Sequence, residues 1–229
     1  MMLAARGAFL AARRKPKLPY DAEVEYLEST GTQYADLGAI VPPNADFEFT
    51  GSIVSDKGNG CIFGESTVFS WNPTNSAYSL VTTSNGRVYL RYGNNTTTAI
   101  GLTTIGLEQT FTASLSGTSF QINGQTVATI TRVSSFSQDV ASMGLFRRNT
   151  LLANGNSTYS AIRINEIKFG SLYELIPVRF TNEQGVSEGA MYDRANPTGG
   201  MNPDGSARTD GLYRNRGTGA FLYGADKVA

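Results

Sequence analysis

The side chains that can do chemistry in this sequence are mainly carboxylates, because it contains no histidine and a single cysteine, Cys61. Without histidine, neither a Ser-His-Asp nor a Cys-His catalytic arrangement can form. One chain also lacks the ligands for a histidine/cysteine zinc site and the second thiol for an intrachain disulfide. The remaining route to catalysis is a pair of acidic side chains facing one cleft, about 5–5.5 Å apart in retaining glycosidases.

Three glutamates near the start form the densest group of such acids. Glu23 and Glu25 share one face of a regular strand, because side chains alternate along it, whereas Glu28 falls on the opposite face. Two further pairs are spaced no better: Asp46 with Glu48, and Glu166 with Glu174. We therefore expect solvated strand charges, no catalytic residue and no enzymatic activity.

Binding of a glycan needs an aromatic ring against the sugar's C–H surface, with Asn, Asp or Arg for the hydroxyls. Two groups have this composition: Trp71-Asn72 with Asn75 and Tyr78, and Arg91-Tyr92 with Asn94 and Asn95. From these we take Trp71, Asn72, Tyr78, Arg91, Tyr92 and Asn94 as candidate glycan-binding residues. A structural role stays open for each group, because a lone Trp in a sandwich is commonly core and Arg91-Tyr92-Gly93 is a plausible strand end.

Two loops carry oxygen ligands of the kind that calcium needs. Asp56-x-x-Asn59 and Asn202-x-Asp204 have suitable side chains, but neither completes a calcium loop with six to eight ligands. We expect ordinary turns there, with no bound metal and no cofactor. Cys61, between Gly60 and Ile62, is expected to be a buried small apolar residue.

The elements that must position these residues are short strands. The chain has 229 residues, 40% of them hydrophobic, with 25 Gly, 11 Tyr and 12 Phe, which is enough for one packed core. Two Asn-Gly pairs, Asn85-Gly86 and Asn123-Gly124, lie between apolar runs and predict hairpins with type I′ turns. No long 3.6-residue period occurs after residue 17. These signals predict an all-β protein with two antiparallel sheets packed face to face.

Six apolar runs are predicted as strands: Phe47–Val54, Cys61–Phe63, Tyr78–Val81, Val140–Phe146, Ala161–Phe169 and Leu172–Phe180. Pro177 in the last run predicts a sheet edge or a strand end, because proline has no N–H to donate. The segment Ala195–Asp210 is rich in turn residues and predicts an exposed loop.

The N-terminus differs in charge from the neighbouring segment. Residues 1–17 hold five bases and no acid, whereas residues 21–48 hold seven acids and no base. We therefore divide the chain into a basic N-terminal arm, 1–19, and one domain, 20–229. The arm is either a frayed terminus or an anchor that docks into a larger assembly, with Arg6, Arg13, Arg14 and Lys15 as the anchor residues.

The overall charge restricts the partners. Lys and Arg together number 19, as do Asp and Glu, so the net charge is zero. A nucleic-acid-binding protein normally has a basic excess, so no nucleic-acid partner is expected. No apolar run approaches about 18 residues, so no membrane insertion is expected either.

Two segments carry a recognisable pattern. The first is Tyr20–Tyr34, with Asp36 and Gly38 behind it; the second comprises Ile176-Pro-Val-Arg179, Gly189-Ala-Met-Tyr-Asp193 and Asn215-Arg-Gly-Thr-Gly-Ala-Phe221. Together they resemble the concanavalin A-like (LamG-type) jelly-roll structural proteins of bacteriophages and prophages of gut bacteria. In that family the last two motifs lie close together in the sequence, whereas here Ala195–Asp210 lengthens the connection.

This resemblance implies a two-sheet jelly roll in a virion structural protein of the capsid or tail, made in the cytoplasm of the bacterial host. It further implies attachment to bacterial-surface or mucin glycans, other virion proteins as partners of the arm, and self-association as a homo-oligomer. Two alternatives remain: a glycoside hydrolase of the same fold, which needs a paired-carboxylate cleft, and a bacterial surface lectin.

Overall fold

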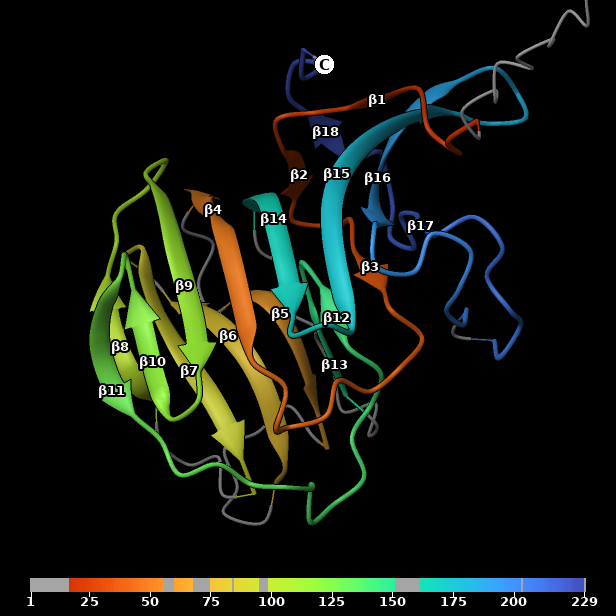
Figure 1. The fold of residues 1–229 in the computed structure, drawn as a ribbon. Coiled ribbons are helices and arrows are strands. Elements are labelled where there is room, and N and C mark those ends of the chain that lie inside the picture. The colour runs from red at the N-terminus through yellow and green to blue at the C-terminus, as the bar shows by residue number, and fades with distance from the viewer. Residues whose placement is uncertain are drawn as a thin grey trace, which may run out of the picture.

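The protein is a β-sandwich, seen in a computed structural model that describes residues 17–55, 60–67, 75–83, 85–94, 99–150, 161–202 and 204–228. Within these ranges the chain forms strands, bridges and turns but no helix. Figure 1 shows the two sheets stacked one behind the other. The prediction of an all-β fold with two packed sheets is therefore confirmed.

Among the described residues, the larger sheet has eleven strands. Its main path runs β11 (Gln125–Thr129), β10 (Ser119–Ile122), β9 (Thr110–Ser116), β4 (Phe47–Ser55), β14 (Ala161–Phe169), β15 (Tyr173–Thr181), β16 (Ser187–Asp193) and β17 (Leu212–Tyr213). Three short strands join this path: β1 (Ala22–Glu23) on β15, β2 (Leu27–Thr30) on β14, and β18 (Leu222–Tyr223) on β2. All of these pairings are antiparallel.

The smaller sheet has seven strands within the part of the chain that the structure describes. Its path runs β3 (Ala35–Asp36), β12 (Gly144–Leu145), β5 (Gly60–Ser66), β6 (Ala77–Thr83), β7 (Arg87–Gly93) and β8 (Ile100–Thr104). β13 (Arg148–Thr150) pairs with β5 in parallel, and the other pairings in this sheet are antiparallel.

The core between the sheets contains aromatic side chains from strands of both sheets. Phe47 of β4 contacts Phe63 of β5 with ring centroids 5.0 Å apart, and Phe63 contacts Phe169 of β14 at the same separation. These three rings are at most 1% exposed. Their edge-to-face geometry is the favoured one for aromatic pairs, and their burial accounts for much of the hydrophobic stabilisation of the sandwich.

Both predicted hairpins are present. Asn85 and Gly86 have φ of 69° and 64° between β6 and β7, and Asn123 and Gly124 have φ of 51° and 76° between β10 and β11. Positive φ at both central positions is what a type I′ turn requires, so the Asn-Gly pairs were sufficient signals.

Two strand predictions differ from the structure. Val140–Phe146 forms a strand only over Gly144–Leu145, and the φ of 63° at Phe146 ends the extended conformation on its C-terminal side. Pro177 is neither at an edge nor at a strand end. It lies in the middle of β15. On one side, β15 pairs with β14 up to Leu175 and with β1 from Val178 onward, so Pro177 lies between the two pairings, where β14 needs no N–H donor.

The opening and closing motifs of the sequence lie side by side. The side-chain oxygen of Asn215 accepts a hydrogen bond from the Tyr34 N–H at 3.2 Å, and the Arg216 N–H donates to the Tyr34 carbonyl at 2.8 Å. Gly217 is required here, because a Cβ at this residue would stand 1.8 Å from the Thr32 carbonyl oxygen. The two motifs are therefore one structural unit.

The segment Ala195–Asp210 is a loop, as predicted, and an isolated antiparallel bridge joins Met201 to Ala207 within it. It projects beside β17 in Figure 1. Among the described residues, no helix is long and apolar enough to cross a membrane.

Candidate functional site

The predicted aromatic glycan-binding residues lie inside the protein. Tyr78 and Tyr92 form a cross-strand pair between β6 and β7, and both point into the core, where they are 0% and 5% exposed. Their hydroxyls donate to the backbone carbonyls of Ala45 at 2.8 Å and Pro43 at 2.6 Å. The prediction that these rings face a sugar is wrong, because the strand register turns both inward.

Arg91 and Asn94 are also engaged within the fold. Arg91 is 1% exposed, and its burial, together with the nearby Arg148, lowers its pKa to about 10. The Asn94 amide oxygen accepts from the Ser76 hydroxyl at 2.9 Å and from the Ser137 N–H at 2.8 Å. Arg91 is therefore too buried to meet a sugar at the surface, so its assignment is wrong, whereas Asn94 is half-buried and its role toward a glycan stays a prediction.

Other predicted sites fall into two groups. Trp71 and Asn72, the arm residues Arg6, Arg13, Arg14 and Lys15, and the loop residues Asp56 and Asn59 lie outside the described residues. Asn202 and Asp204 form an ordinary turn, in which the Asp204 carboxylate accepts from the Ser206 N–H at 2.9 Å. Cys61 is buried, as expected, and its burial raises its pKa to about 12.

The glutamates near the start do not converge on one cleft. Glu23 of β1 pairs with Arg194 at 2.6 Å, and Glu28 of β2 pairs with Arg163, also at 2.6 Å. The hydrogen bond to Glu28 raises the pKa of the Arg163 guanidinium, and its own burial opposes this. These acids hold short strands to their neighbours. The prediction of solvated strand charges is therefore wrong for Glu28, which is only 7% exposed.

A groove of about 440 Å³ lies on the outer face of the larger sheet. We call it the sheet groove and define it by its outward polar side chains: Glu48 and Thr50 of β4, Thr112, Ser114 and Ser116 of β9, and Gln121 of β10. Alternation produces it directly, because Phe47 and Phe49 point into the core and their neighbours must then point outward.

The hydroxyls of the sheet groove are available to a ligand. Within the described part of the chain, the side chains of Thr50, Ser114 and Ser116 make no hydrogen bond of their own. Adjacent strands lie about 4.8 Å apart and side chains on one face repeat about every 7 Å along a strand. The groove therefore presents a regular lattice of donors and acceptors on an open surface.

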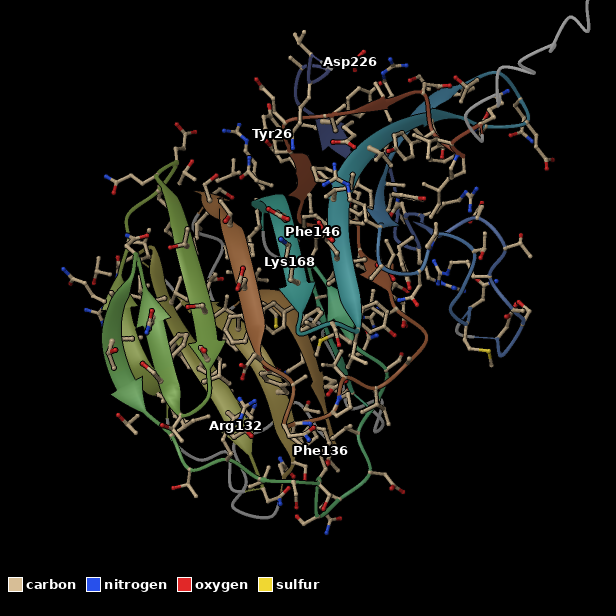
Figure 2. All side chains as sticks on the ribbon, in the orientation of Figure 1. Tyr26, Arg132, Phe136, Phe146, Lys168 and Asp226 are labelled. Atoms are coloured by element: carbon tan, nitrogen blue, oxygen red, sulfur yellow. The ribbon has the colours of Figure 1, made fainter. Side chains whose placement is uncertain are left out.

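A lysine connects the next two strands on the same face. The Lys168 Nζ lies 3.0 Å from a Glu166 oxygen and 3.9 Å from a Glu174 oxygen, and Lys168 stands opposite Glu48 in the register of β14 with β4. Figure 2 labels Lys168 over β14. The hydrogen bond to Glu166 is the largest cause of its raised pKa. Three of the four acids that the sequence offered as two unrelated pairs thus lie around one cation, whereas the fourth, Asp46, pairs with Arg132 at 2.9 Å.

A second recess of about 430 Å³ adjoins the groove, because Thr50 lines both. Its other lining residues include Tyr26, Asn165 and Glu166. The Arg163 guanidinium lies 4.7 Å from the centre of the Tyr26 ring. The outer face thus combines hydroxyls, carboxylates, one amide from each recess and one aromatic ring.

Sequence reasoning missed the sheet groove, although a signal for it exists. Residues 110–116 read Thr-Phe-Thr-Ala-Ser-Leu-Ser, a strict alternation of hydroxyl and apolar side chains. Such a segment has one face in the core and one row of hydroxyls facing solvent. What the sequence does not contain is the strand order that places β9 beside β4.

Comparison with known proteins gives only a partial structural likeness. No protein-family model and no curated protein matches the chain. Two solved structures of Trypanosoma rangeli sialidase, one with sialic acid and one with a difluoro-KDN compound, match at 16% identity with a TM-score of 0.40. They cover 65% and 63% of this chain respectively, which spans 27% and 26% of theirs.

This likeness corrects one expectation from the sequence. We expected no enzymatic activity, and that exclusion is withdrawn, because the similar structures are both of enzymes. At a TM-score of 0.40 the likeness transfers no substrate, residue role or mechanism to this chain.

Proposed function

We propose that this protein is a bacteriophage virion structural protein, associated with the capsid or tail, whose β-sandwich attaches to glycans or to the host surface. The single observation that carries the binding role is the sheet groove, with its row of unengaged hydroxyls on an open sheet face. The virion role rests on the resemblance of the opening and closing motifs to phage jelly-roll proteins.

The chemistry of the sheet groove suits a saccharide. Sugar hydroxyls both donate and accept hydrogen bonds. Hydroxyl and amide side chains can also do both, and carboxylate side chains accept. Each exposed contact is weak, because water competes for the same groups. Display of many copies on one particle raises the effective affinity, and this is why we propose self-association and attachment through many weak contacts.

The basic arm, residues 1–19, is proposed to anchor the domain to other virion proteins. Its bases Arg6, Arg13, Arg14 and Lys15 contrast with the acidic residues of the segment 21–48. An arm of this kind docks by charge and leaves the sandwich outside the particle. Deletion of residues 1–17 is expected to abolish incorporation into virions while leaving the domain folded; unchanged incorporation contradicts the anchor.

A glycan array tests the groove. We expect the wild-type chain to bind a subset of bacterial-surface or mucin glycans, and the double variant Ser114→Ala/Ser116→Ala to lose most of that signal. The matched control is Thr104→Ala, an exposed hydroxyl at the end of β8 in the other sheet. Equal binding by the groove variant and the control contradicts the assignment of the site.

The location of the protein tests the virion role. Antibody labelling of purified particles is expected to show it on the capsid or tail surface. Its absence from purified virions contradicts this part of the proposal and leaves glycan binding to be judged by the array.

One observation favours a glycoside hydrolase as the second candidate. Glu166 and Glu174 both reach the Lys168 Nζ, so their oxygens lie no further apart than the sum of 3.0 and 3.9 Å. Carboxylate separations of about 5–9.5 Å serve retaining or inverting hydrolysis. Release of sugar from a β-glucan panel that is lost in Glu166→Gln supports this candidate. Release that persists in the variant rules out Glu166 as its catalytic acid.

A further inference from the structure

Three arginines gather around a recess on the side of the molecule that carries the Ala195–Asp210 loop. We call it the arginine recess; it has a volume of about 370 Å³, and its lining residues are Asp36, Asn202, Arg208, Leu212, Arg214, Asn215 and Arg216. They come from β3, from the loop, and from β17 and the chain just after it. The recess is separate from the sheet groove, with which it shares no residue.

The acid in the arginine recess is already satisfied by other donors. One oxygen of Asp36 accepts from the Gly38 N–H at 2.8 Å and from the Ser142 hydroxyl at 2.7 Å. Its other oxygen accepts from the Asn149 amide at 2.9 Å. Asp36 therefore anchors its own loop and does not pair with the arginines.

Two acids of the neighbouring loop are engaged as well. Asp210 forms an ion pair with Arg214, and the Asp204 carboxylate accepts from both the N–H and the hydroxyl of Ser206. Arg216 is exposed, and its side chain makes no hydrogen bond or ion pair within the described ranges. Among the lining residues three arginines stand against one carboxylate, that of Asp36, so the recess carries an excess of positive charge, and Arg216 keeps free donors.

Arg208 forms the inner wall of the recess. It is 6% exposed, lies 3.6 Å from the centre of the Tyr213 ring, and donates to the carbonyls of Leu212 at 2.7 Å and Met201 at 2.9 Å. Its Nε is buried and has no hydrogen-bond partner among the described residues. A buried donor without a partner is costly, and the contacts of Arg208 with Tyr213, Leu212 and Met201 keep the side chain in place despite that cost.

The charges in the recess repel one another. Burial lowers the pKa of Arg208, and the nearby Arg214 and Arg216 add to this effect, against opposing contributions from Tyr213 and Asp210. Like charges held together in this way are stabilised by an anion placed between them. The planar guanidinium fork also matches the geometry of a carboxylate or sulfate, with two parallel hydrogen bonds.

We infer that the arginine recess binds the oxyanion of an acidic saccharide, a carboxylate or a sulfate group. The arginines alone indicate that the ligand is an anion, whereas the choice of a saccharide rests on the proposed glycan-binding function. The volume of the recess is in the range of small-molecule sites and has room for one sugar ring. Arg216 and Arg214 hold the anion at the mouth, and Arg208 positions the loop.

Titration calorimetry with small probes tests this inference. Methyl glucuronide is expected to bind and methyl glucoside, its neutral counterpart, is expected not to; inorganic sulfate is expected to compete with the glucuronide. Arg216→Gln removes an exposed charge without breaking a contact of the fold, and is expected to weaken glucuronide binding at least about ten-fold, which corresponds to about 1.4 kcal/mol. The matched control is Arg87→Gln, an exposed arginine of β7, which is expected to change nothing.

The outcomes separate this inference from the groove proposal. Glucuronide binding that survives Arg216→Gln, or no binding of glucuronide at all, overturns the inference, even if sulfate binds. Neutral glycans that bind through the sheet groove are expected to bind Arg216→Gln as they bind wild type. Loss of neutral glycan binding in Ser114→Ala/Ser116→Ala, with glucuronide binding retained, confirms that the two sites act independently.

Discussion

The sheet groove and the arginine recess differ in how the chain builds them. Strands β4, β9 and β10 build the groove from outward side chains that alternate with core residues, and its one charged member, Glu48, stands opposite Lys168 of β14. Segments far apart in the sequence, from Asp36 to Arg216, build the recess, and its unengaged charges have one sign. A surface on regular strands inherits its polarity from alternation, whereas a pocket between loops acquires its charge from the way that the loops meet.

The largest expected effect is on the free energy of unfolding, from a substitution in the core beneath the sheet groove. Phe47 lies on the core side of β4 and packs against Phe63 and Phe120. Phe47→Ala is expected to lower the free energy of unfolding by about 3–5 kcal/mol, because it leaves a cavity between the sheets. Denaturant titration measures this, with Thr112→Ala in the neighbouring strand as the control, expected to stay within about 0.5 kcal/mol of wild type. A small loss in Phe47→Ala would show that the sheets repack.

A smaller loss of stability is expected from a substitution where the closing motif contacts the opening motif, next to the arginine recess. Gly217→Ala places a Cβ against the Thr32 carbonyl and is expected to cost about 1–3 kcal/mol through overpacking. Glucuronide binding is expected to weaken with it, while groove binding persists. The control is Gly199→Ala, where a Cβ comes no closer than 3.4 Å to the Asn196 side chain. Equal stability of both variants would contradict the close approach at Gly217.

The stability of the protein is expected to depend on pH through Glu65, a buried carboxyl of β5. One of its oxygens accepts from the Val41 N–H at 3.0 Å, and the other is buried with no partner among the described residues. Burial raises the pKa of Glu65 well above its usual value. Between the unfolded and folded pKa the native state then binds more protons than the unfolded state, so stability falls as the pH rises through that window.

Glu65→Gln is expected to flatten this dependence and to stabilise the protein at neutral pH by less than Gly217→Ala destabilises it. Thermal melts from about pH 4 to about pH 8 measure the slope. Burial raises the pKa of Tyr173; the nearby Glu65 raises this pKa further, and Arg208 lowers it. A slope that is unchanged in the variant contradicts the assignment of the titration to Glu65.

The smallest effect distinguishes the two regions by their charge. Added salt screens exposed charges over about 8 Å at physiological ionic strength and over about 3 Å at 1 M. Glucuronide affinity is therefore expected to fall several-fold as NaCl rises, while neutral glycan binding in the groove changes little. Calorimetry of both ligands across a salt series measures the difference, and equal salt dependence would contradict the contrast.

The sequence predicted those parts of the structure that depend on neighbouring residues. Asn85-Gly86 and Asn123-Gly124 specified hairpins because only a few residues tolerate positive φ, and Ala195–Asp210 specified a loop because turn residues crowd it. Tyr78 and Tyr92 were misassigned because an aromatic residue near Asn gives the same sequence pattern in a core and in a sugar-binding site. The direction in which a ring points depends on register, and register depends on the partner strand.

Local patterns thus decided the all-β class, the turns and the alternation that produces a polar sheet face. The tertiary structure decided which strands lie side by side, and so it brought Glu48, Glu166 and Glu174 around Lys168. It also brought Arg208, Arg214 and Arg216 together beside Asp36, a residue 172 positions before Arg208 in the chain. The physical reason is that electrostatic and packing energies depend on distance in space, and no short stretch of sequence contains that distance.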